Sequence, residues 1–146
     1  MLKIIKHHKN NLTPDVIDLI NLHMKSDDVD TLKETLKMGL SSDSVILLSL
    51  WHDDEVIGFT YGNVCIGLES KGHYFWLNEF FIKMSFRHQG NGKLLMNYLK
   101  QTLQENKINY IALVTKPTNE QAIAFYQKEG FYQNDYLWFD FTQHTK

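Results

Sequence analysis

Apolar residues along the chain follow two spacings, one typical of strands and one typical of amphipathic helices. Five apolar segments have the length and residue types of strands: 2–7, 44–51, 55–65, 73–84 and 109–115. Four segments carry apolar residues at helical spacing: 14–25, 27–39, 93–106 and 119–129. The aromatic-rich stretch 131–141 predicts one or two final strands. The order β-α-α-β-β-β-α-β-α-β-β predicts an α/β fold with a mixed, mostly antiparallel central sheet flanked by helices.

Local signals fix several ends of these elements. Thr13 and Pro14 are typical of an N-cap and a first helical position, and Gly39 and Gly130 are expected to end helices. His23 lies on the apolar face of the first helix, where a hydrogen-bonded core or boundary histidine is favoured over a metal ligand. The helix at 93–106 is expected to bury five residues: Leu94, Leu95, Tyr98, Leu99 and Leu103.

The connections predict how the strands pair. The short turn 52–54 joins 44–51 and 55–65 into an antiparallel hairpin. Gly58 and Gly62 inside the second of these strands indicate a bulge or a close backbone contact. Helix 93–106 between two strands predicts a right-handed crossover, so that strands 73–84 and 109–115 run parallel.

Composition excludes several classes of protein. The chain has 146 residues, enough for one domain over 1–146 with its own core. A formal net charge of −2 gives no reason to expect a nucleic acid or membrane partner. The single cysteine, Cys65, and the polar N-terminal segment predict a cytoplasmic protein without an internal disulfide. Cys65 is expected to be buried and structural, His7 and His8 to be exposed, and the histidine spacings predict no metal site.

A glycine-containing turn separates strand 73–84 from the following helix. It reads Arg87-His88-Gln89-Gly90-Asn91-Gly92 and leads into Lys93. The turn does not match a P-loop, because Leu94 follows Lys93, and it lacks the third glycine of a dinucleotide-binding fingerprint. The segment 80–104 contains no acidic residue but has four cations, Lys83, Arg87, Lys93 and Lys100. Helix N-terminal amides in a positive field favour a phosphorylated ligand.

A second motif follows about thirty residues later. Residues 119–131 read N-x-x-A-x-x-F-Y-x-x-x-G-F. Together with R-x-x-G-x-G at 87–92, this resembles the GNAT superfamily of N-acetyltransferases. The resemblance is clear over 45–131, and the order of elements extends it to nearly the whole chain.

The resemblance implies acetyl-CoA as co-substrate, bound where strands 73–84 and 109–115 splay apart. It implies that the amides of residues 88–93 (His88, Gln89, Gly90, Asn91, Gly92 and Lys93), next to Arg87, hold the pyrophosphate. The backbone of Phe80, Phe81 and Ile82 would pair with the pantetheine arm. Asn119 would bind further along the cofactor, and Tyr126 would lie by its sulfur. His88 departs from the family, which often has glycine there, and Asn91 and Lys93 replace smaller or aliphatic residues.

The implied reaction is direct attack of an amine on a thioester, which requires a base and a group that stabilises the departing thiolate. Tyr126 suits the second task because a phenol donates a hydrogen bond. Glu79 matches the family's general base, directly or through water. A glutamate among apolar neighbours must face solvent or a cavity, since an unpaired buried carboxylate is costly. A charge on the strand surface is nearly as good an interpretation of Glu79.

In this family the first two helices and the last strands usually line the acceptor site, so their residues suggest the acceptor. Acids at the junction of the first two helices and C-terminal aromatics suit the primary amine of a small cationic metabolite. These residues are Asp27, Asp28, Asp30, Tyr132, Asp135, Tyr136 and Trp138. A helix cap and a core of aromatics explain them equally well. The alternatives are a protein N-terminal or lysine acetyltransferase and a non-catalytic acyl-CoA-binding or sensing domain; a homodimer is compatible with the family.

Overall fold

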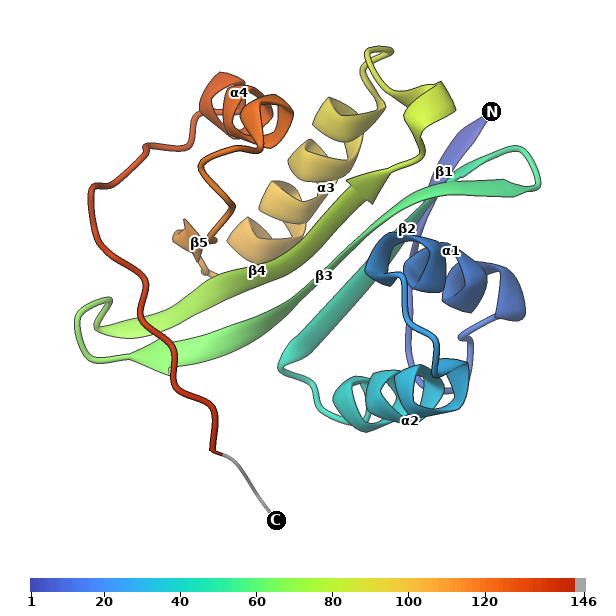
Figure 1. The fold of residues 1–146 in the computed structure, drawn as a ribbon, viewed down its shortest axis with the longest axis horizontal. Coiled ribbons are helices and arrows are strands. Elements are labelled where there is room, and N and C mark those ends of the chain that lie inside the picture. Colours follow the sequence, from blue (N-terminus) through green and yellow to red (C-terminus); the bar gives the residue numbers. More distant parts are fainter. Residues whose placement is uncertain (144–146) are drawn as a thin grey trace. The chain divides into compact units, whose positions relative to one another are not determined.

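The computed structural model describes residues 1–143. Two compact units divide the chain, Met1–Val114 and a C-terminal unit that begins at Thr115. The elements of the first unit are β1 (Leu2–Lys6), α1 (Pro14–Met24), α2 (Val29–Leu40), β2 (Val45–His52), β3 (Glu55–Gly67), β4 (Gly72–Ile82), a 3-10 turn η1 (Met84–Phe86), α3 (Asn91–Glu105) and β5 (Ile111–Ala112) (Figure 1). The second unit contains α4 (Glu120–Lys128).

The sheet has the order β1-β2-β3-β4-β5. The first four strands pair antiparallel, and β4 and β5 pair parallel, which confirms the mixed α/β fold. The parallel ladder covers only two residue pairs, Phe75 with Ile111 and Trp76 with Ala112. The strand predicted at 109–115 is therefore shorter than its apolar run, because a strand extends only as far as its backbone is paired.

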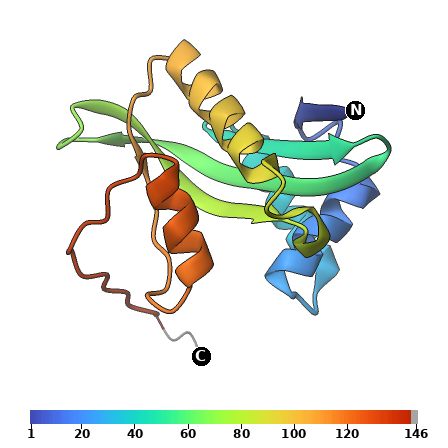
Figure 2. The same ribbon diagram turned by 90° about the horizontal axis from the view of Figure 1, so that it is seen from above.

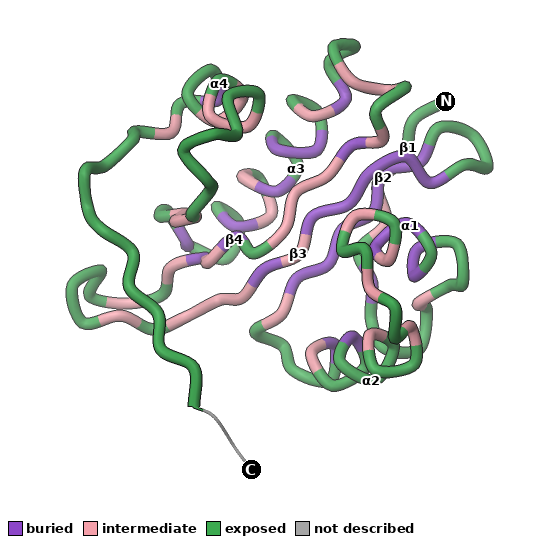
Figure 3. The backbone as a smooth tube through the Cα atoms, in the orientation of Figure 1, coloured by how far each residue is buried: buried purple, intermediate pink, exposed green. Residues whose placement is uncertain are grey.

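Helices cover both faces of this sheet within the first unit. α1 and α2 pack on one face, and α3 lies across the other (Figures 1 and 2). On the α1–α2 face, Val16, Leu19 and Ile20 of α1 meet Leu47 and Phe59 of the sheet in one apolar cluster. Purple backbone follows β2 and the first part of β3 and recurs along α1 and α3, whereas the part of β3 toward the β3–β4 turn is mostly pink (Figure 3). Burial of this apolar surface is what fixes the helices on the sheet.

Both strand glycines occur next to irregular pairing, which confirms the prediction for Gly58 and Gly62. The β2–β3 register shifts beside Gly58. The β3–β4 register shifts beside Gly62: Tyr61 opposes Glu79 and Gly62 opposes Leu77, so Asn78 is the extra residue. This bulge immediately precedes Glu79, and bulges re-aim the side chains that follow them.

Two predictions about helix positions are wrong. Gly39 lies inside α2, which ends at Leu40. A Cβ on Gly39 would lie 2.5 Å from the Tyr61 hydroxyl oxygen, so the glycine permits close contact with β3 and does not end the helix. In α3, Leu95, Leu99 and Leu103 are buried together with Asn91 and Met96, whereas the predicted Leu94 and Tyr98 are each 40% exposed.

Residues 131–143 contain no strand among those described, so the final strands predicted at 131–141 are wrong. Their aromatic content favours an extended chain, but a strand exists only when its backbone pairs with a neighbour. The side chains of Tyr132, Tyr136 and Phe139 are more than four-fifths exposed.

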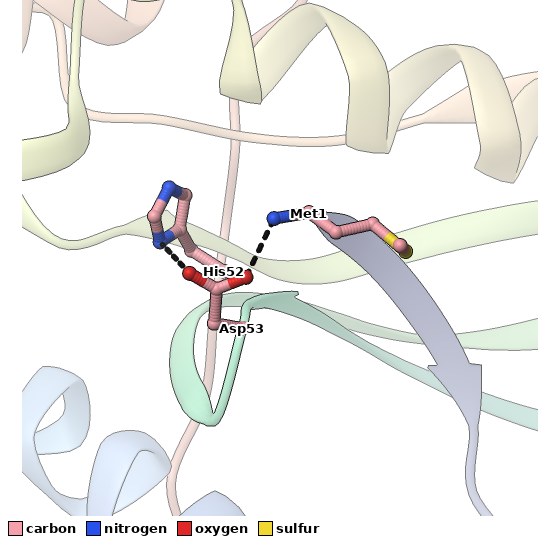
Figure 4. Close-up of polar contacts among 3 residues, drawn as sticks. All are labelled: Met1, His52 and Asp53. Atoms are coloured by element: carbon pink, nitrogen blue, oxygen red, sulfur yellow. Dashed lines mark hydrogen bonds and ion pairs between the residues drawn. The ribbon is translucent and has the colours of Figure 1, made fainter.

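The start of the chain is held against the β2–β3 turn. The Met1 ammonium lies 2.6 Å from Asp53 Oδ1, and His52 Nδ1 lies 3.6 Å from Asp53 Oδ2 (Figure 4). Hydrogen bonding to the ammonium lowers the pKa of Asp53. All three groups are exposed to solvent, so the contact adds little to stability.

His7 is buried, so its predicted exposure is wrong, whereas the predicted exposure of His8 is confirmed. His7 Nε2 lies 2.6 Å from Ser49 Oγ, and His7 Nδ1 lies 3.3 Å from the Asn11 carbonyl oxygen. Trp51 Nε1 also donates to Ser49 Oγ, so the hydroxyl can donate its own proton to a neutral imidazole. Burial lowers the pKa of His7 below 6.5.

We expect this buried histidine to make stability depend on pH. Its pKa is lower in the folded than in the unfolded chain, so the unfolded chain binds the extra proton as pH falls below about 6.5. The free energy of unfolding should then decrease by up to about 1.4 kcal/mol per pH unit. Urea denaturation of wild type and His7→Gln at pH 7.5 and 5.0 tests this, with His8→Gln as control. Equal pH dependence in wild type and His7→Gln would contradict the assignment.

Candidate active site

The turn between β4 and α3 is a loop with two residues in the left-handed region. His88 has φ 61° and Gly90, the residue before α3, has φ 83°. A Cβ on Gly90 would meet nothing within 4 Å, so backbone conformation and not space favours glycine there. His88 and Gln89 are exposed, and the first amides of α3 follow. Gly90 and Lys93 are exposed as well, Gly92 is half-buried and Asn91 is buried. Unpaired amides at a helix N-terminus fit a phosphate group.

Three side chains hold this loop in shape. Arg87 Nε donates to the Ile82 carbonyl oxygen at 2.7 Å, and Gln89 Nε2 donates to the Ser85 carbonyl oxygen at 3.0 Å. Asn91 is 6% exposed, and its Nδ2 donates to the Phe86 carbonyl oxygen at 2.8 Å. Asn91, which differs from the commonest family residue, therefore braces the loop from inside.

The cations predicted around the loop are not equivalent. Lys83 Nζ lies 3.0 Å from the Glu55 carboxylate, so its charge is balanced by an acid from β3. The Arg87 guanidinium carbon lies 5.5 Å from the centre of the Phe81 ring. Lys93, in the first turn of α3, is exposed. The positive field at the loop therefore depends on fewer cations than the sequence indicates.

The backbone N–H and C=O groups of successive β4 residues point alternately toward β3 and toward the β5 side of the strand. The Lys83 N–H donates to the Ile57 carbonyl oxygen, so in this antiparallel ladder Phe81 faces its partner Phe59 on β3. The backbone groups of Phe80 and Ile82 point to the other edge, where the β4–β5 ladder ends at Trp76. Of the three residues predicted to pair with pantetheine, Phe80 and Ile82 therefore direct their backbone groups to the β5 side of β4, and Phe81 directs its own to β3.

Glu79 faces a small cavity between α1, α2 and the sheet. The cavity has a volume of about 200 Å³. Its walls are mostly apolar, with Glu79 as the carboxylate: Ile20, Met24, Leu32, Thr35, Leu36, Phe59, Tyr61, Asn78 and Glu79. A hollow of about 410 Å³ shares Met24, Leu32 and Thr35 with it. The alternative of a plain surface charge is therefore less favoured for Glu79, because its side chain is 31% exposed and lines a cavity.

His23 is the hydrogen-bond partner of Glu79. Its Nε2 lies 2.8 Å from Glu79 Oε2, and its side chain is 27% exposed. The imidazole packs 4.7 Å from the Phe81 ring and 5.6 Å, edge-on, from the Phe59 ring, measured between ring centres. The expectation of a hydrogen-bonded boundary histidine is confirmed, and its partner is the candidate base.

Two other residues on the acceptor side are Asp28, for which a helix cap was one of the two interpretations, and Tyr61, for which the sequence made no prediction. Asp28 caps α2: its carboxylate accepts from the Thr31 N–H and hydroxyl, and the hydroxyl contributes most to its lowered pKa. The helix-cap interpretation of this acid is therefore favoured. Tyr61, directly opposite Glu79 in the ladder, lines the cavity, and burial raises the pKa of its phenol.

The second unit holds the other two predicted site residues. Asn119 Oδ1 accepts from the Ala122 N–H at 3.2 Å, so Asn119 caps α4. Tyr126 packs edge-on against Phe125 and Phe131, with each pair of ring centres 5.4 Å apart. The Phe131 N–H donates to the Tyr126 carbonyl oxygen, and Gly130, at φ 95°, ends the helix as predicted.

Cys65 is partly exposed, so its expected burial is wrong. Residue 65 lies near the end of β3, where the strand runs toward an exposed turn. Within residues 1–143, no group of three or more histidine, cysteine or acidic side chains could hold a metal ion. The helices of that same part of the chain are too short or too polar to cross a membrane.

The first unit thus combines a mixed sheet, whose last two strands pair parallel, with a loop that leads from β4 into the N-terminus of α3. A family model for the acetyltransferase (GNAT) family matches residues 15–131. The chain belongs to this acetyltransferase family and is an acyltransferase, as the sequence motifs predict.

Solved structures share the fold over nearly the whole chain. An aminoglycoside acetyltransferase from an uncultured soil metagenomic sample, in complex with trehalose, has a TM-score of 0.84 at 17% identity, covering 98% of this chain and 97% of its own. Aminoglycoside acetyltransferase AAC(6')-Iy, in complex with a CoA-containing bisubstrate analogue, has a TM-score of 0.85 at 18% identity, with 99% of each chain covered. Ribosomal-protein-alanine N-acetyltransferase from Brucella melitensis biovar Abortus 2308 has a TM-score of 0.79 at 13% identity, covering 98% and 100%. At these identities the likeness shows a common fold.

Replacing His88 with glycine should stabilise the protein slightly. The left-handed conformation of His88 costs a residue with a Cβ about 1–2 kcal/mol. Glycine avoids this cost but loses more chain entropy on folding, which offsets part of the gain. We expect the free energy of unfolding to rise by up to about 1 kcal/mol in urea denaturation, with CoA affinity unchanged. Gln89→Gly, a neighbour outside the left-handed region, is the control and should be destabilising. A loss of stability in His88→Gly would show that its side chain is needed.

Proposed function

We propose that the protein transfers the acetyl group of acetyl-CoA to the primary amine of a small cationic metabolite. The observation that carries the proposal is Glu79, a carboxylate held by His23 in a small, largely apolar cavity. A volume of about 200 Å³ lies below the ~300–1,000 Å³ typical of sites for drug-sized ligands. A carboxylate beside Phe59 and Tyr61 suits one ammonium group on a short carbon stem.

The cofactor end of the proposal rests on the loop and on the edge of β4. The residues fit acetyl-CoA: the amides at 88–93 would bind its pyrophosphate, and Phe80 and Ile82 would pair with its pantetheine arm. CoA-containing ligands are present in the structures of AAC(6')-Iy. Bound acetyl-CoA supplies the activated thioester carbonyl.

The residues of the chain then have separate tasks. Glu79, directly or through a water, takes a proton from the ammonium so that the nitrogen lone pair is free. Attack forms the C–N bond of the amide and breaks the C–S bond, and the nitrogen releases a second proton as the neutral amide forms. The departing sulfur receives a proton or a hydrogen bond, which we assign to the Tyr126 phenol. We assign Asn119 to binding further along the cofactor, besides its cap.

We further propose that the two units form one N-acetyltransferase domain over 1–146. The family match supports this, since residues 15–131 include parts of both units. The acceptor cavity belongs wholly to the first unit and the proposed acid, Tyr126, to the second.

Release of CoA thiol from acetyl-CoA, with a panel of amines, tests the function. The panel contains short alkylamines, diamines, polyamines, amino sugars, aminoglycosides, and peptides with a free N-terminus or lysine. We expect turnover with small amines, and a kcat about 10- to 100-fold lower in Tyr126→Phe with CoA affinity unchanged. Tyr98→Phe, which alters a partly exposed tyrosine on α3, is the matched control. CoA binding without turnover would favour a sensing domain, and turnover of peptides alone would favour a protein acetyltransferase.

A further inference from the structure

We propose that His23 is a positioning residue for the reaction: its imidazole orients the Glu79 carboxylate toward the acceptor amine. The inference rests on the proposed function, because it assumes that Glu79 is the base. His23 and Glu79 are separated by 56 positions in sequence, yet Nε2 and Oε2 lie 2.8 Å apart. When Nε2–H donates to Oε2, the other carboxylate oxygen is left to accept the proton of the amine.

The position of the imidazole is set by the core on one side and by aromatic rings on the other. His23 follows Leu19 and Ile20 by four and three residues, so all three lie on one face of α1. Leu19 and Ile20 are each 3% exposed and anchor that face. The Phe59 and Phe81 rings then hold the imidazole from the sheet. A donor fixed in this way needs no reorganisation when the substrate binds.

Among the described residues that line the cavity, Glu79 is the only carboxylate. His23 lies in the last turn of α1. Around the pair, β3 contributes the Tyr61 phenol to the cavity, and the Arg87 guanidinium lies over Phe81 beside β4. α2 contributes Leu32, Thr35 and Leu36, none of which titrates. Glu79 is therefore the carboxylate that meets both the imidazole and the cavity.

Two substitutions of His23 separate hydrogen bonding from packing. His23→Gln keeps an N–H donor but loses the ring, whereas His23→Phe keeps a ring between Phe59 and Phe81 but loses the donor. Misplacing a catalytic group by about 1 Å can cost about 10²-fold in rate. We expect His23→Phe to lower kcat by about 10- to 100-fold with the KM for acetyl-CoA unchanged, and His23→Gln to stay within about threefold of wild type.

A double-mutant cycle provides the second readout. In the Glu79→Gln background, His23→Phe should cause no further loss, because the group that it orients is already disabled. Equal losses in both backgrounds, or a His23→Gln variant that is more impaired than His23→Phe, would show a packing role and overturn the inference. Thermal melts of each variant identify any loss that comes from unfolding.

The outcomes also separate this inference from the proposed function. Glu79→Gln with wild-type turnover would refute the proposed base and therefore both claims. An impaired Glu79→Gln beside a fully active His23→Phe would overturn the role of His23 alone. No turnover by the wild type with any amine would refute the proposed function, and this inference with it.

Discussion

Replacing Glu79 with glutamine is expected to lower kcat for amine acetylation by about 10²- to 10⁴-fold at neutral pH, the range for loss of a general base. Glutamine has nearly the same shape and can still bond to His23, so the cavity should keep its form. The difference is that an amide cannot accept the amine proton. Thiol release under saturating acetyl-CoA measures the effect, and calorimetric titration with CoA should show unchanged affinity.

Glu69→Gln is the matched control, since Glu69 is an exposed carboxylate in the turn between β3 and β4. It should retain wild-type kinetics. A Glu79→Gln variant with full activity would mean that a water chain or another group removes the proton. The prediction also has a pH signature: the loss in the variant should shrink at high pH, where more of the amine is already deprotonated.

The loop was predictable because its signals are local. A strand, a glycine-containing turn and an apolar-periodic helix occupy consecutive residues, and the structure forms them in that order as β4, the loop and α3. His88 stands at φ 61°, a conformation that favours glycine. Local backbone preferences decide such a feature, so the sequence contains them directly.

The acceptor side was less predictable because it is assembled from distant residues. His23 and Glu79 come from α1 and β4, and their contact depends on the register of the whole sheet. Lys83 looked free in a segment without acids, but β3 brings Glu55 to it. Helical spacing placed His23 on the buried face of α1, which was the one available signal for its role. Tyr61 had no comparable signal.

The strand residues were predictable in kind but not in extent. Apolar character defined β2 and β3 well, since both are buried against helices. The same character at 109–115 and 131–141 did not produce equally long strands, because pairing and not composition ends a ladder. An isolated sequence cannot show which neighbour a strand will have.

Among the glycines of β3, Gly62 should tolerate an added methyl group least, so Gly62→Ala should be strongly destabilising. A Cβ on Gly62 would lie 2.3 Å from Phe75 Cζ and 2.5 Å from the Trp76 carbonyl oxygen, and Phe75 is fully buried. Overpacking of a core typically costs about 1–3 kcal/mol, and a backbone carbonyl moves less readily than a side chain. We expect a loss near 3 kcal/mol, which lowers Tm by roughly 6–12 °C for a chain of this length.

Gly67→Ala in the same strand is the control for Gly62→Ala. Its Cβ would meet Ser70 Oγ at 2.7 Å, a side-chain atom that can rotate away, so its melting temperature should change much less. Because Gly62 borders the bulge that precedes Glu79, Gly62→Ala should also lower kcat below the folding transition, whereas Gly67→Ala should not. Equal melting temperatures for the two variants would mean that Phe75 and β4 shift to accommodate the methyl group. The bulge would then be too deformable to orient the Glu79 side chain.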